Sequence, residues 1–168
     1  MQQDAGYIIR KFLPGEVQLY KVMRLEALQL EAGMFSSSYA REVGFSNEQW
    51  LARLEGEDTA CFGLFYNDEL IGITGIVIDR DDPGLAHMVQ SYIRKQHRGR
   101  GLSRLYYDTR LQWAANYPGL KTVRTGHRES NTVSKAANQH YNFKFAYRET
   151  IDWPDGTTAD VLYYDLKL

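Results

Sequence analysis

The sequence is poor in features that would each define a class of protein. Its single cysteine, Cys61, excludes a disulfide within the chain and says nothing against a reducing compartment. No apolar run reaches the roughly 18 residues of a membrane-spanning helix, and the first residues lack the apolar core of a signal peptide. From these absences we expect a soluble, cytoplasmic protein without a membrane partner.

Neither sign of charge dominates the chain. The 20 lysines and arginines are matched by 21 aspartates and glutamates, and the formal net charge is −1. A protein that binds mainly nucleic acid usually carries a basic excess over its whole domain. We therefore expect no nucleic-acid partner, and any basic cluster is a local feature.

The chain also lacks internal divisions. No repeat, low-complexity stretch or linker interrupts the 168 residues, of which 43% are hydrophobic. A chain of this length supports one well-packed core, so we expect a single domain over residues 1–168. Its histidines, cysteine and carboxylates show no metal-ligand spacing, and we expect no metal.

Strand-like and helix-like segments alternate along the sequence. The predicted helices cover residues 17–30, 46–54, 102–117 and 131–141. The predicted strands cover residues 7–13, 60–66, 70–78, 87–93, 122–125, 145–153 and 161–166. Antiparallel pairing followed by a β-α-β crossover predicts an α/β fold, with a mixed, mostly antiparallel central sheet of about seven strands flanked by about four helices.

The most informative segment runs from Gln96 to Gly101, and we call it the glycine loop. It lies between an apolar run and a predicted helix, and Gly99 and Gly101 are separated by one residue. Such glycines let backbone N–H groups turn inward toward an anion, which the positive end of the following helix dipole also attracts. Five cations surround the loop, with no acid before Asp108: Arg94, Lys95, Arg98, Arg100 and Arg104. A pyrophosphate fits this concentration of positive charge.

A second motif follows the glycine loop. Asn131-x-x-Ser134 opens the last predicted helix, and Asn142-Phe143 closes it. The chain resembles the GCN5-related N-acetyltransferase (GNAT) superfamily in three features. These are this motif, the pattern Gln-x-x-Gly-x-Gly, and the order of elements along nearly the whole chain. The resemblance implies the GNAT fold and acetyl-CoA as cosubstrate.

The resemblance also implies which residues hold the cofactor. Ile93 would offer its backbone N–H to the thioester carbonyl, an oxyanion-type role. The remaining cofactor-binding residues would be Arg98, Gly99, Arg100, Gly101, Leu102, Ser103, Asn131 and Ser134.

Two positions depart from the family pattern. Asn142 replaces the usual closing glycine, a mild change because asparagine tolerates the left-handed conformation. Asn138 stands where many members carry a tyrosine that protonates the leaving thiolate. An amide cannot give up a proton at useful cost, although its NH₂ group can hydrogen-bond the sulfur. Tyr141 is an alternative acid, or a core residue where relatives pack a leucine.

The candidate general base is His87, six residues before Ile93, where related enzymes often have a glutamate. Histidine titrates near neutrality, which suits proton transfer from an amine. The alternative is a histidine exposed at a strand end or bonded in a structural role. Glu26 and Glu31, on the first predicted helix, are the next candidates.

The acceptor groove of such a fold would lie between residues 34–39 and the hairpin tip at 153–160. Its predicted lining combines aromatic side chains with carboxylates: Glu26, Phe35, Tyr39, Glu31, Glu42 and Asp155. These residue types fit a primary amine of a small molecule or a peptide without choosing between them.

The sequence therefore predicts an acetyl-CoA-dependent N-acetyltransferase. One alternative is a catalytically weak CoA-binding module of the same fold, which Asn138 supports. The other is a nucleic-acid-binding domain that uses the basic cluster at 94–104. The aromatic C-terminal hairpin, with Phe145, Tyr147, Trp153, Tyr163 and Tyr164, predicts a homodimer.

Overall fold

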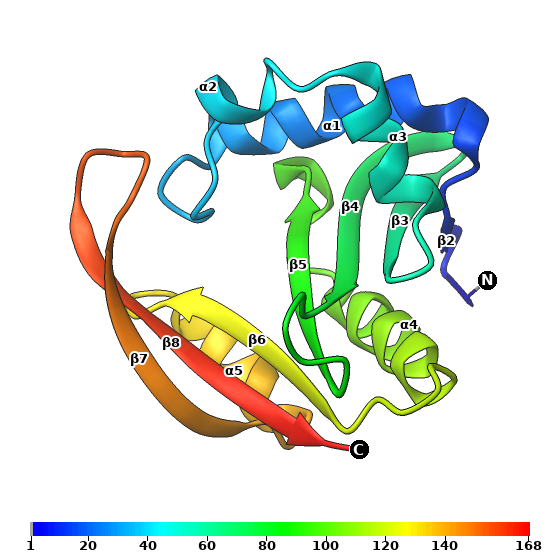
Figure 1. Ribbon diagram of the computed structural model, residues 1–168. Coiled ribbons are helices and arrows are strands. Elements are labelled where there is room, and N and C mark those ends of the chain that lie inside the picture. Colours follow the sequence, from blue (N-terminus) through cyan, green and yellow to red (C-terminus); the bar gives the residue numbers. More distant parts are fainter. Residues whose placement is uncertain (1) are drawn as a thin grey trace.

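The computed structural model describes residues 2–168, in which eight strands form one sheet between two layers of helices (Figure 1). The strands are β1 (Gln2–Asp4), β2 (Tyr7–Lys11), β3 (Thr59–Tyr66), β4 (Glu69–Ile78), β5 (Leu85–Ile93), β6 (Thr122–Arg128), β7 (Lys144–Asp152) and β8 (Thr158–Lys167). The helices are α1 (Val17–Leu30), α2 (Tyr39–Glu42), α3 (Asn47–Glu55), α4 (Ser103–Ala115) and α5 (Thr132–His140), with short 3-10 turns η1 (Pro14–Glu16) and η2 (Lys95–His97).

The sheet has the order β1-β2-β3-β4-β5-β6-β8-β7, and among the described strands only the β5–β6 pair is parallel. The predicted fold class is confirmed, with one short strand and one short helix beyond the expected number. Strand β6 continues past the predicted end at 125 because β8 pairs with it as far as Arg128. Pairing with a neighbour thus overrides the weak strand preference of the polar residues there.

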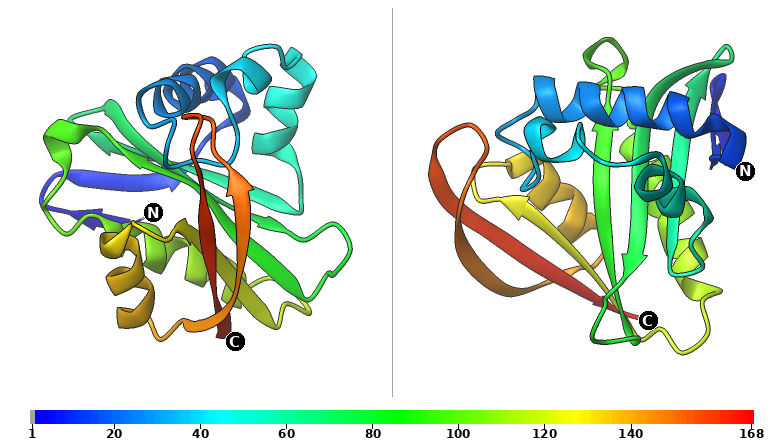
Figure 2. Two further views of the ribbon diagram at one scale, coloured as in Figure 1. Left: turned by 90° about the vertical axis from the view of Figure 1, so that its left-hand side faces the viewer. Right: turned by 45° about the horizontal axis from the view of Figure 1, so that its top comes forward.

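Each face of the sheet has its own core, and Figure 2 shows the two helical layers from two further sides. One core lies under α1 and α3 and contains Tyr20, Met23, Ala27, Trp50, Leu54 and Cys61. The other lies under α4 and α5 and contains Leu105, Tyr106, Tyr107, Val123 and Phe143. The helices that follow β5 and β6 therefore cover one face, and the N-terminal helices cover the other.

Strands β5 and β6 separate from each other after a short paired stretch. They pair only over residues 85–87 of β5 and 122–124 of β6. Both strands then continue, to Ile93 and Arg128, along diverging paths that Figure 1 shows as a V. We call this region the splay, and it exposes one edge of each strand inside the sheet.

A bulge in β5 lies within the splay. Gln90 and Ser91 together face Thr74 of β4, and Gln90 has a positive φ of 61°. The extra residue reverses which side chains face each core: Met88 packs toward α4, whereas Tyr92 packs toward α1.

Several local predictions are confirmed. Helix α3 begins with a capping box in which Ser46 and Gln49 bond each other's backbone N–H groups. Asn142 adopts a left-handed φ of 66° after α5.

None of the helices in residues 2–168 combines the length and apolar character that a bilayer crossing requires.

The C-terminal hairpin hides more of its aromatic surface than the sequence suggests. Trp153 and Tyr164 are buried, and the Trp153 indole N–H donates to the carbonyl of Ala159. Phe145 and Tyr147 remain exposed on β7, the edge strand of the sheet.

Candidate active site

The glycine loop forms a concave row of backbone donors before α4. Gly99 and Gly101 have φ values of +76° and +73°, in the left-handed region. Within the described chain, no group accepts a hydrogen bond from the N–H groups of residues 99–103, and no side chain caps α4. The side chain of Leu102 is buried in the core, so only its backbone faces the loop. Such a nest at a helix N-terminus is a preformed site for an anion.

Most cations near the loop are already paired with carboxylates. Arg94 bonds Glu26 and Glu69, and Arg104 bonds Asp4. Arg98 bonds Glu31 at 2.6 Å and the carbonyl of Ile93 at 2.7 Å. Of the five, only Lys95 and Arg100 have no carboxylate partner among residues 2–168. Backbone groups are therefore the main anion donors of the loop.

The geometry of β5 turns the backbone N–H of Ile93 into the splay. The N–H of Arg94 donates to the carbonyl of Ile71 on β4 at 2.9 Å. Backbone groups alternate along a strand, so the N–H of Ile93 points to the opposite edge, toward β6. The glycine loop begins three residues later. A thioester carbonyl in the splay and a pyrophosphate on the loop would thus be held by one continuous segment.

Both motif residues of α5 contribute to its first turn. The Asn131 side chain caps the helix by accepting from the backbone N–H of Ser134 at 3.0 Å. Asn138 lies farther along the same helix face and is almost completely buried. Its Oδ1 accepts a hydrogen bond from the Tyr107 hydroxyl.

Tyr141 lies in a packed position against α4. Its ring stacks on Tyr107 at a centroid distance of 4.4 Å, and its hydroxyl donates to Asp108 at 3.0 Å. Burial and this hydrogen bond raise the pKa of Tyr141 to about 12. The structure thus gives Tyr141 a packing role and directs its proton to Asp108.

The candidate base His87 lies on the part of β5 that still pairs with β6. Its Nε2 is 2.7 Å from Asp79 Oδ2, and its side chain is 30% exposed. The hydrogen bond from His87, aided by the backbone N–H of Asp81, lowers the pKa of the Asp79 carboxyl. Six residues of extended strand span about 20 Å, so an amine held near Ile93 reaches His87 only through water. Glu31 lies closer to Ile93 than His87 does, because Arg98 bonds both Glu31 and the carbonyl of Ile93.

The hairpin tip expected to flank the acceptor groove meets Gly33, the residue just before the other expected segment, 34–39. Arg128, from the end of β6, donates to the carbonyl of Gly33 at 3.1 Å and to Asp155 at 2.9 Å. A Cβ added to Gly33 would lie only 2.6 Å from Asp155 Oδ2. This junction of Gly33, Arg128 and Asp155 closes the open end of the splay on the α1 side. Trp153 lies beneath the Arg128 guanidinium at 5.1 Å.

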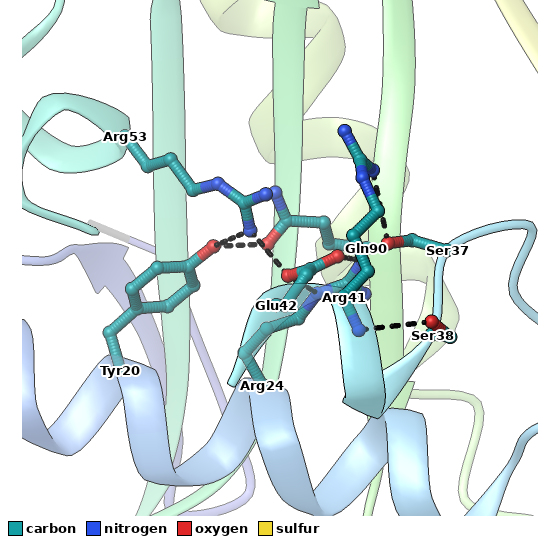
Figure 3. A network of polar contacts seen from close by, with 8 residues as sticks. All are labelled: Tyr20, Arg24, Ser37, Ser38, Arg41, Glu42, Arg53 and Gln90. Atoms are coloured by element: carbon teal, nitrogen blue, oxygen red, sulfur yellow. Dashed lines mark hydrogen bonds and ion pairs between the residues drawn. The ribbon is translucent and has the colours of Figure 1, made fainter. Parts of the chain in front are cut away.

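The predicted role of Glu42 at this groove is wrong. Glu42 is fully buried and bonds both Arg24 and Arg53, as Figure 3 shows. Burial alone would raise the pKa of Glu42, but hydrogen bonds and charge from Arg24, with Arg53, lower it to about 2. Gln90 of the β5 bulge joins the same network through the Tyr20 hydroxyl. Glu42 therefore holds α1, α2 and α3 together and cannot reach a substrate.

The other predicted acceptor residues are only partly free. Glu26 accepts hydrogen bonds from the Tyr92 hydroxyl and from two nitrogens of Arg94, each at 3.0 Å. Phe35 packs beside the Arg24 guanidinium at 5.1 Å, and Tyr39 is 38% exposed at the start of α2. Glu26 thus has a structural role, whereas the two aromatic side chains border the α1 side of the sheet.

Two residues of the site were missed by the sequence reasoning, Tyr107 and Arg110. Arg110 is buried and donates to Ser91 of the β5 bulge at 3.0 Å. One signal was present: Arg110 lies at helical spacing among the buried residues of α4, where a polar side chain is unusual. Nothing in the sequence indicated that Tyr107 would meet Asn138.

Comparisons with known proteins agree with this architecture. The profile of the acetyltransferase (GNAT) family matches residues 24–143. A solved GNAT-family acetyltransferase from Streptococcus pneumoniae is 17% identical, with 96% of this chain and 99% of that chain covered and a TM-score of 0.79. An N-acetyltransferase from Staphylococcus aureus Mu50 is 19% identical, with 97% and 99% covered and a TM-score of 0.76.

A third solved structure contains the cofactor. Microcin C7 self-immunity acetyltransferase MccE, in complex with acetyl-CoA and AMP, is 12% identical, with 98% of this chain and 94% of that chain covered and a TM-score of 0.74. No curated protein sequence gives a significant match. At such low sequence identities, the similarity to these solved structures shows the fold alone.

Proposed function

Because this chain belongs to the GNAT acetyltransferase family, whose cosubstrate is acetyl-CoA, we propose that it transfers the acetyl group to the nitrogen of a primary amine. The acceptor we propose is a small molecule or the terminus of a peptide. The observation that carries this proposal is the splay of β5 and β6, in which the free N–H of Ile93 leads directly into the glycine loop.

The residues of the site divide the work of binding and orientation. The N–H groups of residues 99–103 would hold the pyrophosphate, and Arg100 would add charge. Acetyl-CoA supplies an acetyl group activated as a thioester. The N–H of Ile93 would stabilise negative charge on the carbonyl oxygen, a role that is worth a few kcal/mol for a well-placed donor. The junction of Gly33, Arg128 and Asp155 would limit the approach of the acceptor.

A catalytically weak CoA-binding module remains the second candidate, and Asn138 is the observation that favours it. The nucleic-acid alternative loses support, because Arg94, Arg98 and Arg104 are neutralised by carboxylates of the same chain. An exposed stripe of unpaired cations would be needed for phosphate-backbone binding.

A panel of amines with acetyl-CoA as donor tests the proposed function. Free-thiol detection measures CoA release for amino acids, polyamines, aminoglycosides and short peptides. We expect amine-dependent release with at least one class and a matching mass increase of one acetyl group on that amine. Tight CoA binding without release for any amine would favour the binding module.

As a base that acts through a chain of water molecules, His87 should contribute on the order of 100-fold to kcat/KM, and we expect His87→Ala to remove this factor together with the rising limb of the pH profile. CoA affinity should not change, because His87 lies on the paired part of β5, away from the glycine loop. His140→Ala is the matched control, since His140 is exposed at the end of α5. A rising limb that survives in His87→Ala and disappears in Glu31→Gln would assign the base to Glu31.

We also propose a homodimer through β7, whose outer edge is unpaired among the described strands and whose Phe145 is 55% exposed. Exposed edges of this kind favour pairing with another chain. We expect light scattering at tens of micromolar to give twice the mass of 19.4 kDa. A mass of one chain would contradict the proposal.

A further inference from the structure

A pocket of about 440 Å³ lies between α5 and the C-terminal hairpin of β7 and β8, outside the candidate active site. Its volume is within the range of small-molecule sites, roughly 300 to 1,000 Å³. Among the described residues, neither the glycine loop nor the junction of Gly33, Arg128 and Asp155 contributes to its lining. A ligand of this pocket would therefore bind in addition to the cofactor and the acceptor.

Helix α5 separates the pocket from α4. On one side of the helix, Asn138 accepts a hydrogen bond from the Tyr107 hydroxyl of α4. The next residue, Gln139, is turned by about 100° around the helix axis and lines the pocket. Lys135, one turn before Gln139, lines it too. The two sides of α5 thus face different neighbours, the helix that follows the glycine loop and the C-terminal hairpin.

The floor of the pocket is apolar. Phe143 and Tyr164 are buried, and Leu162, which also lines the pocket, is half-buried. Phe145, at the start of β7, meets Tyr164 edge-on at a centroid distance of 5.8 Å and stays 55% exposed. A large exposed aromatic side chain in the wall of a cavity is typical of a surface that a ligand covers.

The rim of the pocket is positively charged. Lys135 of α5 and Lys144 of β7 are both exposed, and neither has a carboxylate partner within residues 2–168. Arg148 also lines the pocket, but Glu129 and Asp160 pair with it. The uncompensated charge of the rim is therefore that of two lysines, which lie beside an apolar floor.

We propose that this pocket binds a small amphipathic anion, with its apolar body on Phe145 and Tyr164 and its carboxylate paired with Lys135 and Lys144. An apolar floor alone would accept neutral ligands equally well, whereas two unpaired lysines favour a negative charge and disfavour a positive one. The side-chain amide of Gln139, which makes no hydrogen bond within the described chain, supplies a further donor at the rim. The site goes beyond the proposed function, because none of these residues takes part in the proposed acetyl transfer.

Titration of the isotopically labelled protein, followed by NMR, tests the proposal with two matched ligands. Naphthylacetate carries a carboxylate, and naphthylacetamide has the same aromatic body without the charge. We expect saturable shifts of the backbone amides of Gln139, Lys144 and Phe145. The acid should bind on the order of tenfold more tightly than the amide, because its contacts with lysine are charge-assisted. This preference should shrink as the salt concentration rises from about 0.05 M to about 0.5 M, since salt screens charges at the surface.

Substitutions separate the charged part of the site from the apolar part. Lys144→Gln should lower the preference for the acid, and the combination with Lys135→Gln should remove it. Phe145→Ser should weaken the binding of both ligands on the order of tenfold and leave their ratio unchanged, because it removes apolar contact and no charge. Lys121→Gln and Val133→Ser are the matched controls, since both side chains are exposed outside the pocket. All of these positions lie at the surface, where substitutions have small effects on folding.

The outcomes separate this inference from its alternatives. Equal affinity for the acid and the amide would overturn it, because the lysines would then select no charge. Shifts centred on the glycine loop, or displacement of the acid by saturating CoA, would overturn it by placing the acid in the cofactor site. A Phe145→Ser protein of halved mass and unchanged ligand affinity would also overturn it, because a second copy of the chain would then cover the pocket. Naphthylacetate binding at the pocket without CoA release for any amine would support the inference and contradict the proposed function.

Discussion

Gly99→Val is expected to abolish measurable CoA binding, with a loss of affinity of at least about 100-fold. Gly99 has a φ of +76°, a conformation that strains a β-branched residue. Apart from residues 98–100 themselves, no heavy atom of the described chain lies within 4 Å of the position that a Cβ would take. The valine methyl groups would therefore fill the open space in front of the free N–H groups, where the pyrophosphate is expected to bind.

The chain offers a matched control for the strain alone. Gly119, in the turn between α4 and β6, has a φ of +79°, and beyond residues 118–120 no heavy atom of residues 2–168 lies within 4 Å of the position that a Cβ would take. Gly119→Val should lower the unfolding temperature as Gly99→Val does, yet leave CoA affinity unchanged. Calorimetry measures both. A folded Gly99→Val protein that binds CoA normally would refute the assignment of the loop.

Glu42→Gln should lower the free energy of unfolding by about 3 to 5 kcal/mol at neutral pH. The substitution keeps the shape of the side chain but leaves the charge of Arg24, which is 5% exposed, without its buried partner. Arg53 loses the same carboxylate. Urea unfolding measures the effect. A cost below about 1 kcal/mol would show that the network is not a stabilising element.

The effect of Glu42 should depend on pH in a defined direction. The folded-state pKa of about 2 lies below the ordinary value of 4.5. A depressed folded pKa contributes stability that is present above the unfolded pKa and is lost as the pH falls through the folded one. The difference between the native protein and Glu42→Gln should therefore shrink between about pH 5 and 2.

The exposed pair of Arg10 and Glu16 provides the comparison. Their side chains are 34% and 21% exposed, and the pair bonds at 2.8 Å. Exposed ion pairs contribute at most about 1 kcal/mol. Glu16→Gln should thus cost much less than Glu42→Gln at the same pH, because only the buried pair leaves a charge out of contact with water.

Local signals in the sequence predicted much of the fold. Residues 17–30 were predicted as a helix, and α1 has these bounds. The prediction succeeded because both of its signals, the apolar stripe along the helix and the Pro-Gly break before it, are local to this part of the sequence. The glycine conformations and the left-handed Asn142 are equally local. The bulge at Gln90 was not predictable, since it is fixed from both sides by α1 and α4, through Tyr20 and Arg110.

In the candidate site, too, local features were predictable and contacts between elements were not. The backbone donors of the glycine loop follow from two glycines and the start of a helix, so the sequence indicated them. The burial of Glu42 depends on Arg24 and Arg53, which lie on two other helices. The contact of Tyr107 with Asn138 joins residues that are 31 positions apart. Side-chain partners of this kind are set by how the helices pack, which no spacing in the sequence records.

The free N–H groups of residues 99–103 also bear on how such a protein evolves. Every residue except proline has a backbone N–H, so a ligand held by the main chain constrains few side chains. Only the two glycines are required by their conformation. If the proposed assignment holds, substitutions can accumulate in the rest of the loop without loss of cofactor binding. Lineages could then diverge at the junction of Gly33, Arg128 and Asp155, where we propose that the acceptor approaches.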